Sequence, residues 1–272
     1  MSEDQIRLIA FGAHPDDCEI ICGGLATKYV SLGYPVKFVS VTNGNAGHHI
    51  EQRDNLAKIR LKESQESANI LGIEYEVLNY NDGELMPSLE ARNQIIRLIR
   101  EWKADVVISH RPNDYHPDHR YTGSLVQDAA YLVTVPPICP EAAPLTINPF
   151  FFYFWDQFKK PYPFQPDAVI SVDDVMDKKW DMMHCHASQF YEWLAYIEKV
   201  TEPVPHDDTE RKDWLAKIWS PFLIEITKCA REKLSKRYGA DKAKTIQFAE
   251  AFEICEYGRT PDQSDIERIF PA

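Results

Sequence analysis

Residues 13–17 read Ala-His-Pro-Asp-Asp, which puts one histidine and two carboxylates within four positions. His14 and Asp17 are three residues apart, and Pro15 between them stiffens a turn because its ring fixes its own φ. In such a turn both side chains can point to one side and share a metal ion, with Asp16 beside them. An aspartate here could instead cap a following helix. Capping would account for one carboxylate and leave the other carboxylate and the histidine unexplained.

A second cluster of the same kind lies at residues 110–120, His-Arg-Pro-Asn-Asp-Tyr-His-Pro-Asp-His-Arg. It holds three of the nine histidines of the chain, and the three-residue spacing recurs between His116 and His119, around Pro117 and Asp118. A solvated polar loop is the alternative for this cluster taken by itself. The repeated spacing favours a metal site.

Two imidazoles and one carboxylate with an open coordination position are typical of catalytic zinc. Iron(II) sites use the same ligand types, so iron and other divalent metals stay open. Bound zinc can lower the pKa of a coordinated water to about 7, which makes a nucleophile at neutral pH. The spare carboxylate, Asp16, could accept the proton of that water. The spare histidine could stabilise a developing oxyanion or protonate a leaving amine.

The order of apolar segments indicates how the two clusters meet. Strands are expected at 6–12, 36–42, 74–80 and 104–110. They alternate with a helix at 23–33, a long helix that ends at 71–72, and a helix at 89–102. This alternation predicts an α/β, Rossmann-like three-layer fold with a mostly parallel sheet. In strand order 3-2-1-4 the first and fourth strands are neighbours, and ligands bind outside their carboxyl ends. The clusters follow these two strands, so we expect the metal site there.

The second half of the chain is less regular. Strands are expected at 150–155 and 167–172, followed by a helix over 173–199. A proline-rich surface excursion at 135–149 and a charged, exposed loop at 200–213 interrupt the pattern. We expect residues 1–272 to form a single domain with an irregular C-terminal half.

Composition limits the partners. The formal net charge of −12 argues against nucleic acid and anionic membranes, which bind concentrated basic faces. The run at 149–155 is far shorter than the roughly 20 apolar residues of a membrane helix. Six cysteines without a Cys-x-x-Cys pair favour reduced, buried thiols. We therefore expect a soluble, cytoplasmic protein that acts on a small molecule.

The paired motifs AHPDD (13–17) and HPDH (116–119) resemble the signature of the PIG-L/LmbE-like family, zinc-dependent N-acetylglucosaminyl de-N-acetylases. Weaker similarities are RLKESQESANILGI (60–73), which looks like the Arg-x-x-Glu helix of the family, HASQ (186–189) and AEAF (249–252). The resemblance implies a hydrolase that removes the N-acetyl group from an N-acetylglucosamine-type sugar or glycoconjugate. It also implies that homo-oligomers are common.

Roles follow from the resemblance position by position. Asp16 becomes the general base, and His116 stabilises the tetrahedral intermediate or acts as the acid. Asp118 resembles the position that hydrogen-bonds and tunes the catalytic histidine. The zinc ligands implied are His14, Asp17 and His119.

Two further residues are candidates for substrate binding. Arg60 matches the family arginine that holds the substrate, although a helix-surface arginine paired with Glu63 is the alternative. His48 follows the second strand, on the edge of the sheet expected to carry the site. The chain departs from the family pattern at Cys18, which separates the aspartate pair from Glu19 and leaves open whether Glu19 only caps a helix.

Two other functions stay open at this point. The same mononuclear site could hydrolyse a phosphoester or a non-sugar amide, or the protein could be a catalytically silent sugar-binding protein of the same fold. A pure binder needs neither Asp16 nor His116, which favours the enzyme.

Overall fold

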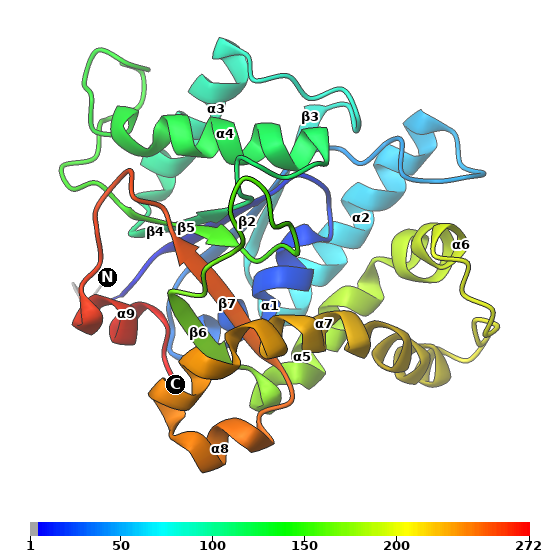
Figure 1. Cartoon of the computed structure of the whole chain (residues 1–272). Helices are drawn as coiled ribbons and strands as arrows, with labels where there is room; N and C mark the ends of the chain where they lie inside the picture. The colour runs from blue at the N-terminus through cyan, green and yellow to red at the C-terminus, as the bar shows by residue number, and fades with distance from the viewer. Residues whose placement is uncertain (1–4) are drawn as a thin grey trace.

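The computed structural model describes residues 5–272, and within them seven strands form one sheet of order β3-β2-β1-β4-β5-β7-β6 (Figure 1). The order 3-2-1-4 predicted for the first four strands is confirmed. β1 to β5 run parallel, while β7 is antiparallel to both β5 and β6. The bounds are β1 Leu8–Gly12, β2 Val36–Thr42, β3 Glu74–Tyr80, β4 Val106–Ser109, β5 Phe150–Phe154, β6 Ala168–Ser171 and β7 Ala249–Ile254.

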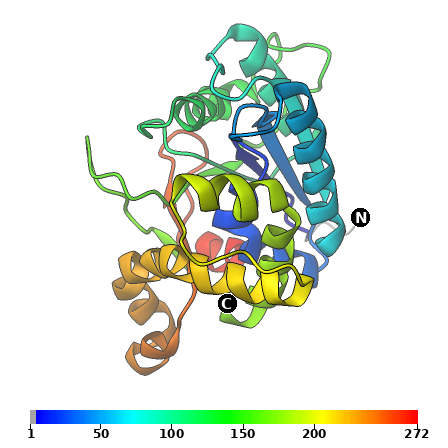
Figure 2. The same ribbon diagram turned by 90° about the vertical axis from the view of Figure 1, so that its right-hand side faces the viewer.

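Helices cover both faces of this sheet, as the α/β prediction requires (Figure 2). Alternate residues of β1 face opposite cores, because side chains alternate along a strand. Leu8 and Ala10 belong to the core under α1 and α7, and Ile9 and Phe11 to the core under α3 and α4. The longer helices are α1 Asp17–Ser31, α2 Arg53–Leu71, α3 Leu89–Trp102, α4 Pro117–Leu132, α5 Met176–Cys185 and α7 Asp208–Tyr238; the short ones are α6 Leu194–Ile197, α8 Ala240–Thr245 and α9 Gln263–Ile269.

The first helix starts earlier than the sequence predicted. α1 begins at Asp17 and is kinked at Cys22, so the predicted helix 23–33 is only its second part. Just after the kink, the carboxylate of Glu250 in β7 accepts hydrogen bonds from the backbone N–H groups of Gly24 (2.7 Å) and Leu25 (2.8 Å). Lys179 of α5 pairs with the same buried carboxylate at 2.6 Å. A distant strand thus caps the second part of α1.

The predicted continuous helix over 173–199 is wrong. A short 3-10 turn, η1 (Asp173–Val175), leads into α5, and the chain leaves helical geometry at His186 (φ −84°, ψ 60°). A π-helical segment, η2 (Ser188–Trp193), then leads into α6. Strand β7 was not expected either. The charged stretch 200–213 is a loop only up to Asp207, whose side chain caps α7.

The proline-rich excursion 135–149 connects α4 to β5 and is fastened to α3. The buried guanidinium of Arg100 donates to backbone carbonyls of Leu132, Val133, Val135, Ile138, Cys139 and Ala142.

All six cysteines are free. None of the helices among residues 5–272 combines the length and apolar character needed to cross a membrane.

Candidate active site

The ends of β1 and β4 bring the two motifs together. Nδ1 of His14 lies 3.2 Å from Nε2 of His119. Oδ2 of Asp17 lies 3.6 Å from Nδ1 of His14, and Oδ1 of Asp17 lies 3.6 Å from Nε2 of His119. Ligands about 2.0–2.1 Å from a tetrahedral zinc ion lie roughly 3.3 Å apart. The two nitrogens are therefore spaced like two ligands of one ion, and each oxygen of Asp17 lies near one of these nitrogens.

Hydrogen bonds at the far sides of the two rings support this arrangement. Nε2 of His14 lies 3.2 Å from Oδ2 of Asp118 and 3.3 Å from Oδ1 of Asp82. Nδ1 of His119 lies 3.1 Å from Oδ2 of Asp114. A metal-bound histidine typically donates its other N–H to a carboxylate in this way. With these tautomers, two nitrogen lone pairs face each other at 3.2 Å, and a cation between them removes their repulsion.

Charges around the ligands favour cation binding. Burial alone would lower the pKa of His14, but hydrogen bonds to Asp118, Asp17 and Asp82 raise it well above its usual value. Burial alone would raise the pKa of Asp17, but the nearby His119 and His110 hold it well below its usual value. The pocket thus attracts a positive charge, which a metal ion can supply in place of a proton.

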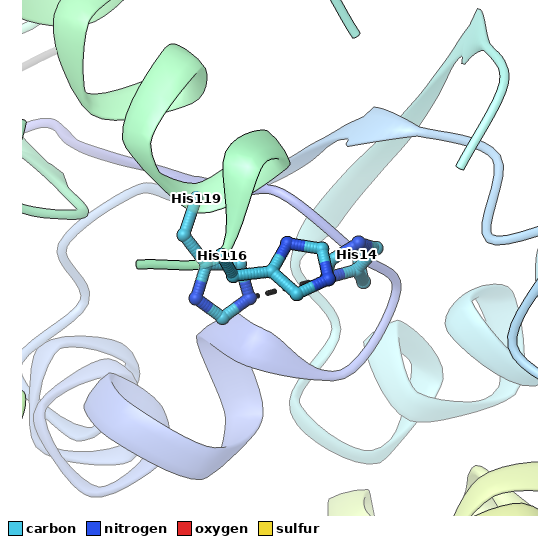
Figure 3. A group of neighbouring side chains, drawn as sticks. All are labelled: His14, His116 and His119. Carbon is cyan, nitrogen blue, oxygen red and sulfur yellow. Dashed lines mark hydrogen bonds between the residues drawn. The ribbon is translucent and has the colours of Figure 1, made fainter. Parts of the chain in front are cut away.

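Three groups of side chains in this region each bring one ligand atom per residue within 4.8 Å of one another, and none of them is the full predicted set. They are His14 with His116 and His119, Asp17 with His110 and His119, and His14 with Asp82 and Asp118. Figure 3 shows the three imidazoles of the first group, with His116 and His119 coming from the start of α4 and His14 from the loop before α1. All three groups overlap the predicted set.

Asp118 is placed differently from the expectation. Its carboxylate accepts from the backbone N–H groups of Gly83 (2.6 Å) and Leu85 (3.3 Å) and contacts His14. The backbone N–H of Asp118 donates a hydrogen bond to Nδ1 of His116, at 3.2 Å. The carboxylate therefore contacts a predicted metal ligand directly, and it acts on the predicted catalytic histidine through its charge, which raises the pKa of that ring against the lowering by burial.

His116 is the N-cap residue of α4, so the HPDH motif starts a helix and does not form a loop. Because Nδ1 accepts a hydrogen bond, the neutral ring carries its proton on Nε2. Burial, together with the electrostatic effect of the neighbouring imidazoles of His14 and His119, lowers the pKa of His116. The ring is therefore a neutral N–H donor at neutral pH.

Asp16 occupies a backbone conformation that non-glycine residues rarely adopt, with φ at 149°. Its side chain makes no capping bond with α1 and instead accepts from Nη2 of Arg60 at 2.9 Å. Burial raises the pKa of Asp16 to about 6, although the charge of Arg60 lowers it. A carboxylate with a pKa near the working pH suits a general base.

Arg60 lies inside the protein and not on a helix surface, with 2% of its area exposed. Nη2 also donates to the carbonyl of Pro15 at 2.6 Å. The guanidinium crosses Gly44, where a Cβ would lie 2.6 Å from Nη1. Glu63, the alternative partner, accepts instead from the N–H and the hydroxyl of Ser188, both at 2.7 Å.

His48 is engaged outside the cluster. Its Nε2 lies 2.9 Å from Oε2 of Glu192, and its Nδ1 accepts from the N–H groups of Ile50 and Glu51. The structure does not bring His48 to the cavity described below.

Glu19 is fully buried in α1 and caps nothing. It accepts from the hydroxyl of Ser67 at 2.7 Å and lies 2.8 Å from Nε2 of His186. Glu19 and Glu63 thus hold the HASQ segment at the break between α5 and η2. Gln189 of this segment donates to the carbonyl of Gly47 at 3.2 Å and reaches the site.

A cavity of about 490 Å³ opens over the cluster. Its walls include the polar side chains of Arg60, Asp82, Gln189 and Glu198, and Trp193 of η2. Five residues of the two sequence motifs also line the cavity: His14, Asp16, Asp17, His116 and His119.

Sequence reasoning gave no role to Asp82 or Asp114 and did not name Trp193 or Glu198 of the cavity wall. Asp114 lies within the second histidine cluster, and Asp82 lies in an Asn-Asp-Gly turn after the third strand. The position of Asp82 beyond the carboxyl end of a parallel strand was a usable signal.

Comparison with known proteins agrees with this geometry. The family model PIG-L, described as GlcNAc-PI de-N-acetylase, matches residues 9–130. Diacetylchitobiose deacetylase of Thermococcus kodakarensis is 29% identical over 72% of this chain and 77% of that protein. A probable N-acetyl-alpha-D-glucosaminyl L-malate deacetylase 2 of Bacillus anthracis is 30% identical over 82% of this chain and 96% of that protein.

Solved structures extend the comparison. N,N'-diacetylchitobiose deacetylase from Pyrococcus horikoshii superposes with a TM-score of 0.71 at 27% identity, over 96% of this chain and 89% of that one. A 4-carboxy-2-hydroxymuconate hydratase from Pseudomonas putida has a TM-score of 0.72 at 18% identity, over 95% and 99%, so it shares the fold alone. With the fold, the His/Asp cluster and these relatives in agreement, the chain belongs to the PIG-L/LmbE-like family of metal-dependent de-N-acetylases.

Proposed function

We propose that the protein removes the N-acetyl group from an N-acetylglucosamine-type sugar or glycoconjugate, using one zinc ion held by His14, Asp17 and His119. The observation that carries the proposal is the pair of facing nitrogens of His14 and His119, with Asp17 beside both and Asp16 in the same cavity. A zinc ion there supplies a Lewis acid that polarises a carbonyl and lowers the pKa of water.

The protein groups divide the remaining work. Asp16 takes a proton from the attacking water, because its carboxylate is charged above about pH 6. Arg60 keeps that carboxylate in place by an ion pair at 2.9 Å. His116 donates Nε2–H to the carbonyl oxygen as negative charge develops on it. The proton held by Asp16 is then available to the leaving amine.

The cavity over the cluster suits a sugar. Arg60, Asp82, Gln189 and Glu198 offer donors and acceptors for hydroxyl groups, and Trp193 offers an aromatic surface. Hydroxyl groups left unpaired in a buried site are costly, so a polar lining of this kind favours a polyhydroxylated substrate. The role predicted for His48 has no support from this cavity.

We further propose a cytoplasmic enzyme formed by residues 1–272 as one domain, with homo-oligomers expected from the family resemblance. Six free thiols suit a reducing compartment, and the sheet takes strands from both halves of the chain.

Free-acetate release from a panel of N-acetylglucosamine derivatives tests the reaction. We expect Asp16→Asn to lower the rate about 10²–10⁴-fold with unchanged zinc content, since only the base is lost. His119→Ala should lose the metal, as measured by elemental analysis. Full activity of the zinc-loaded Asp16→Asn protein, or normal zinc in His119→Ala, would contradict the assignments.

A further inference from the structure

A second cavity, of about 270 Å³, reaches the same cluster. It shares Asp17, Ile20, His116 and His119 with the larger cavity. Two of the predicted metal ligands, Asp17 and His119, and the predicted oxyanion donor His116 therefore stand where the two cavities meet. A substrate bond held at this point has space on two sides.

The smaller cavity differs in character from the larger one. Away from the shared cluster, four large apolar side chains form half of its wall residues; the other four are His110, Asp114, Asp156 and Gln157. Trp155 is buried and its ring meets that of Phe222 edge-on, with centroids 5.6 Å apart. The apolar side chains are Ile21, Trp155, Phe158 and Phe222.

An amide has one substituent on its carbonyl carbon and another on its nitrogen. The larger cavity fits an amino sugar on the nitrogen, which leaves the smaller cavity, with its four large apolar side chains, for the acyl chain. A water molecule occupies about 30 Å³ in the liquid, and the methyl group of an acetyl is of similar size. Acetyl alone would therefore leave most of the 270 Å³ unfilled.

We propose that the smaller cavity binds the acyl group of the substrate, and that the enzyme removes straight acyl chains longer than acetyl, such as propionyl, butyryl and hexanoyl, from amino sugars. This inference rests on the proposed function and names its substrate class. Water adds its oxygen to the carbonyl carbon, the C–N bond breaks, and the acid leaves as a carboxylate. Both protons of the water go to the amine, which leaves as an ammonium, so no further reactant is needed.

The acyl-length profile tests the proposal. Burying one methylene group is worth about a fourfold gain in binding. We therefore expect kcat/KM to rise about fourfold per added carbon from N-acetyl- to N-butyrylglucosamine. A tenfold fall from the acetyl to the propionyl compound would overturn the proposal, while continued acetate release would leave the deacetylase function standing.

Binding provides a readout that does not depend on turnover. The Asp16→Asn protein, titrated calorimetrically with the same series, should bind the butyryl compound more tightly than the acetyl compound. Affinity that falls as the chain lengthens would overturn the acyl cavity even if no compound were hydrolysed.

Two variants locate the effect. Gln157 is exposed on the wall of the smaller cavity, so Gln157→Trp should narrow it without disturbing the core. Ile197 lines only the larger cavity of the two, and Ile197→Ala is the matched control. We expect Gln157→Trp to lower the hexanoyl-to-acetyl ratio of kcat/KM at least about tenfold. An unchanged ratio in Gln157→Trp, or an equal change in Ile197→Ala, would contradict the assignment of the chain to this cavity.

Discussion

The carboxylate of Asp118 lies 3.2 Å from Nε2 of His14, while Nδ1 of the same ring faces His119. Two backbone N–H groups hold that carboxylate, so its position is fixed independently of the ring. This contact sets the tautomer of His14 and leaves Nδ1 free for a cation.

We expect Asp118→Asn to weaken zinc binding about 10–100-fold, because the amide is a poorer acceptor for the imidazole N–H. Competition with a chromophoric chelator measures the affinity, and activity should largely return at saturating zinc. If Asp118 tuned His116 instead, zinc affinity would stay unchanged and the pH profile would shift.

Activity should fall in acid as Asp16 takes up a proton. Burial raises the pKa of this carboxyl to about 6, and a bound cation would lower it. The acid limb of kcat/KM should therefore lie at or below about pH 6, with the rate lost as the pH falls through it. A profile flat down to pH values well below this limb would rule out Asp16 as the base.

Arg60→Met should move the acid limb of the kcat/KM profile to higher pH. The guanidinium lowers the pKa of Asp16, so its removal lets the pKa rise. Lys58→Met is the matched control, since Lys58 is an exposed cation on the same helix. Equal shifts in the two variants would mean that the overall charge, and not the ion pair, sets the limb.

Gly44 and Gly72 have nearly the same backbone conformation, with φ at 65° and 68°. Alanine at either position costs roughly 1–2 kcal/mol for the left-handed conformation. Only at Gly44 would the new Cβ displace the guanidinium of Arg60, because nothing lies within 4 Å at Gly72. Gly44→Ala should therefore lose activity as well as stability, while Gly72→Ala loses stability alone. Equal activities in steady-state assays would refute a role for Arg60 in the site.

Local patterns were enough to predict the first half of the fold. α3 matches its predicted range, 89–102, because its apolar residues recur with helical spacing. The two histidine motifs located the site because strand order brings their ends together. Distances between side chains could not be predicted this way, so the contact between the carboxylate of Asp118 and His14 was not expected.

The second half depends on contacts between distant residues. The helix over 173–199 breaks where His186 meets Glu19 and Ser188 meets Glu63, both far away in the sequence. Strand β7 carries Glu250 fully buried, and the amides and the lysine that stabilise it come from α1 and α5. A buried glutamate hides the apolar pattern by which a strand is recognised.

Ser188→Ala should lower the free energy of unfolding by about 1–3 kcal/mol. The buried carboxylate of Glu63 would lose the hydroxyl donor of Ser188 and keep only the backbone N–H donor. KM should rise more than kcat falls, since Gln189 and Trp193 next to Ser188 line the substrate cavity. Urea denaturation and steady-state kinetics measure the two effects. Ser124→Ala, which removes only a hydroxyl bond within α4, should change stability by no more than about 0.5 kcal/mol.

Lys179→Met tests whether the capping of α1 by β7 holds the helix in place. Lys179 and Glu250 are both buried, and removing one partner leaves an uncompensated charge at a cost of about 3–5 kcal/mol. The exposed pair of Lys228 and Glu225 is the control, and Lys228→Met should cost less than about 1 kcal/mol. If chemical denaturation gave the same small loss for both lysines, the two amides of α1 alone would suffice to hold the charged Glu250. The kink at Cys22 would then need no ion pair to persist.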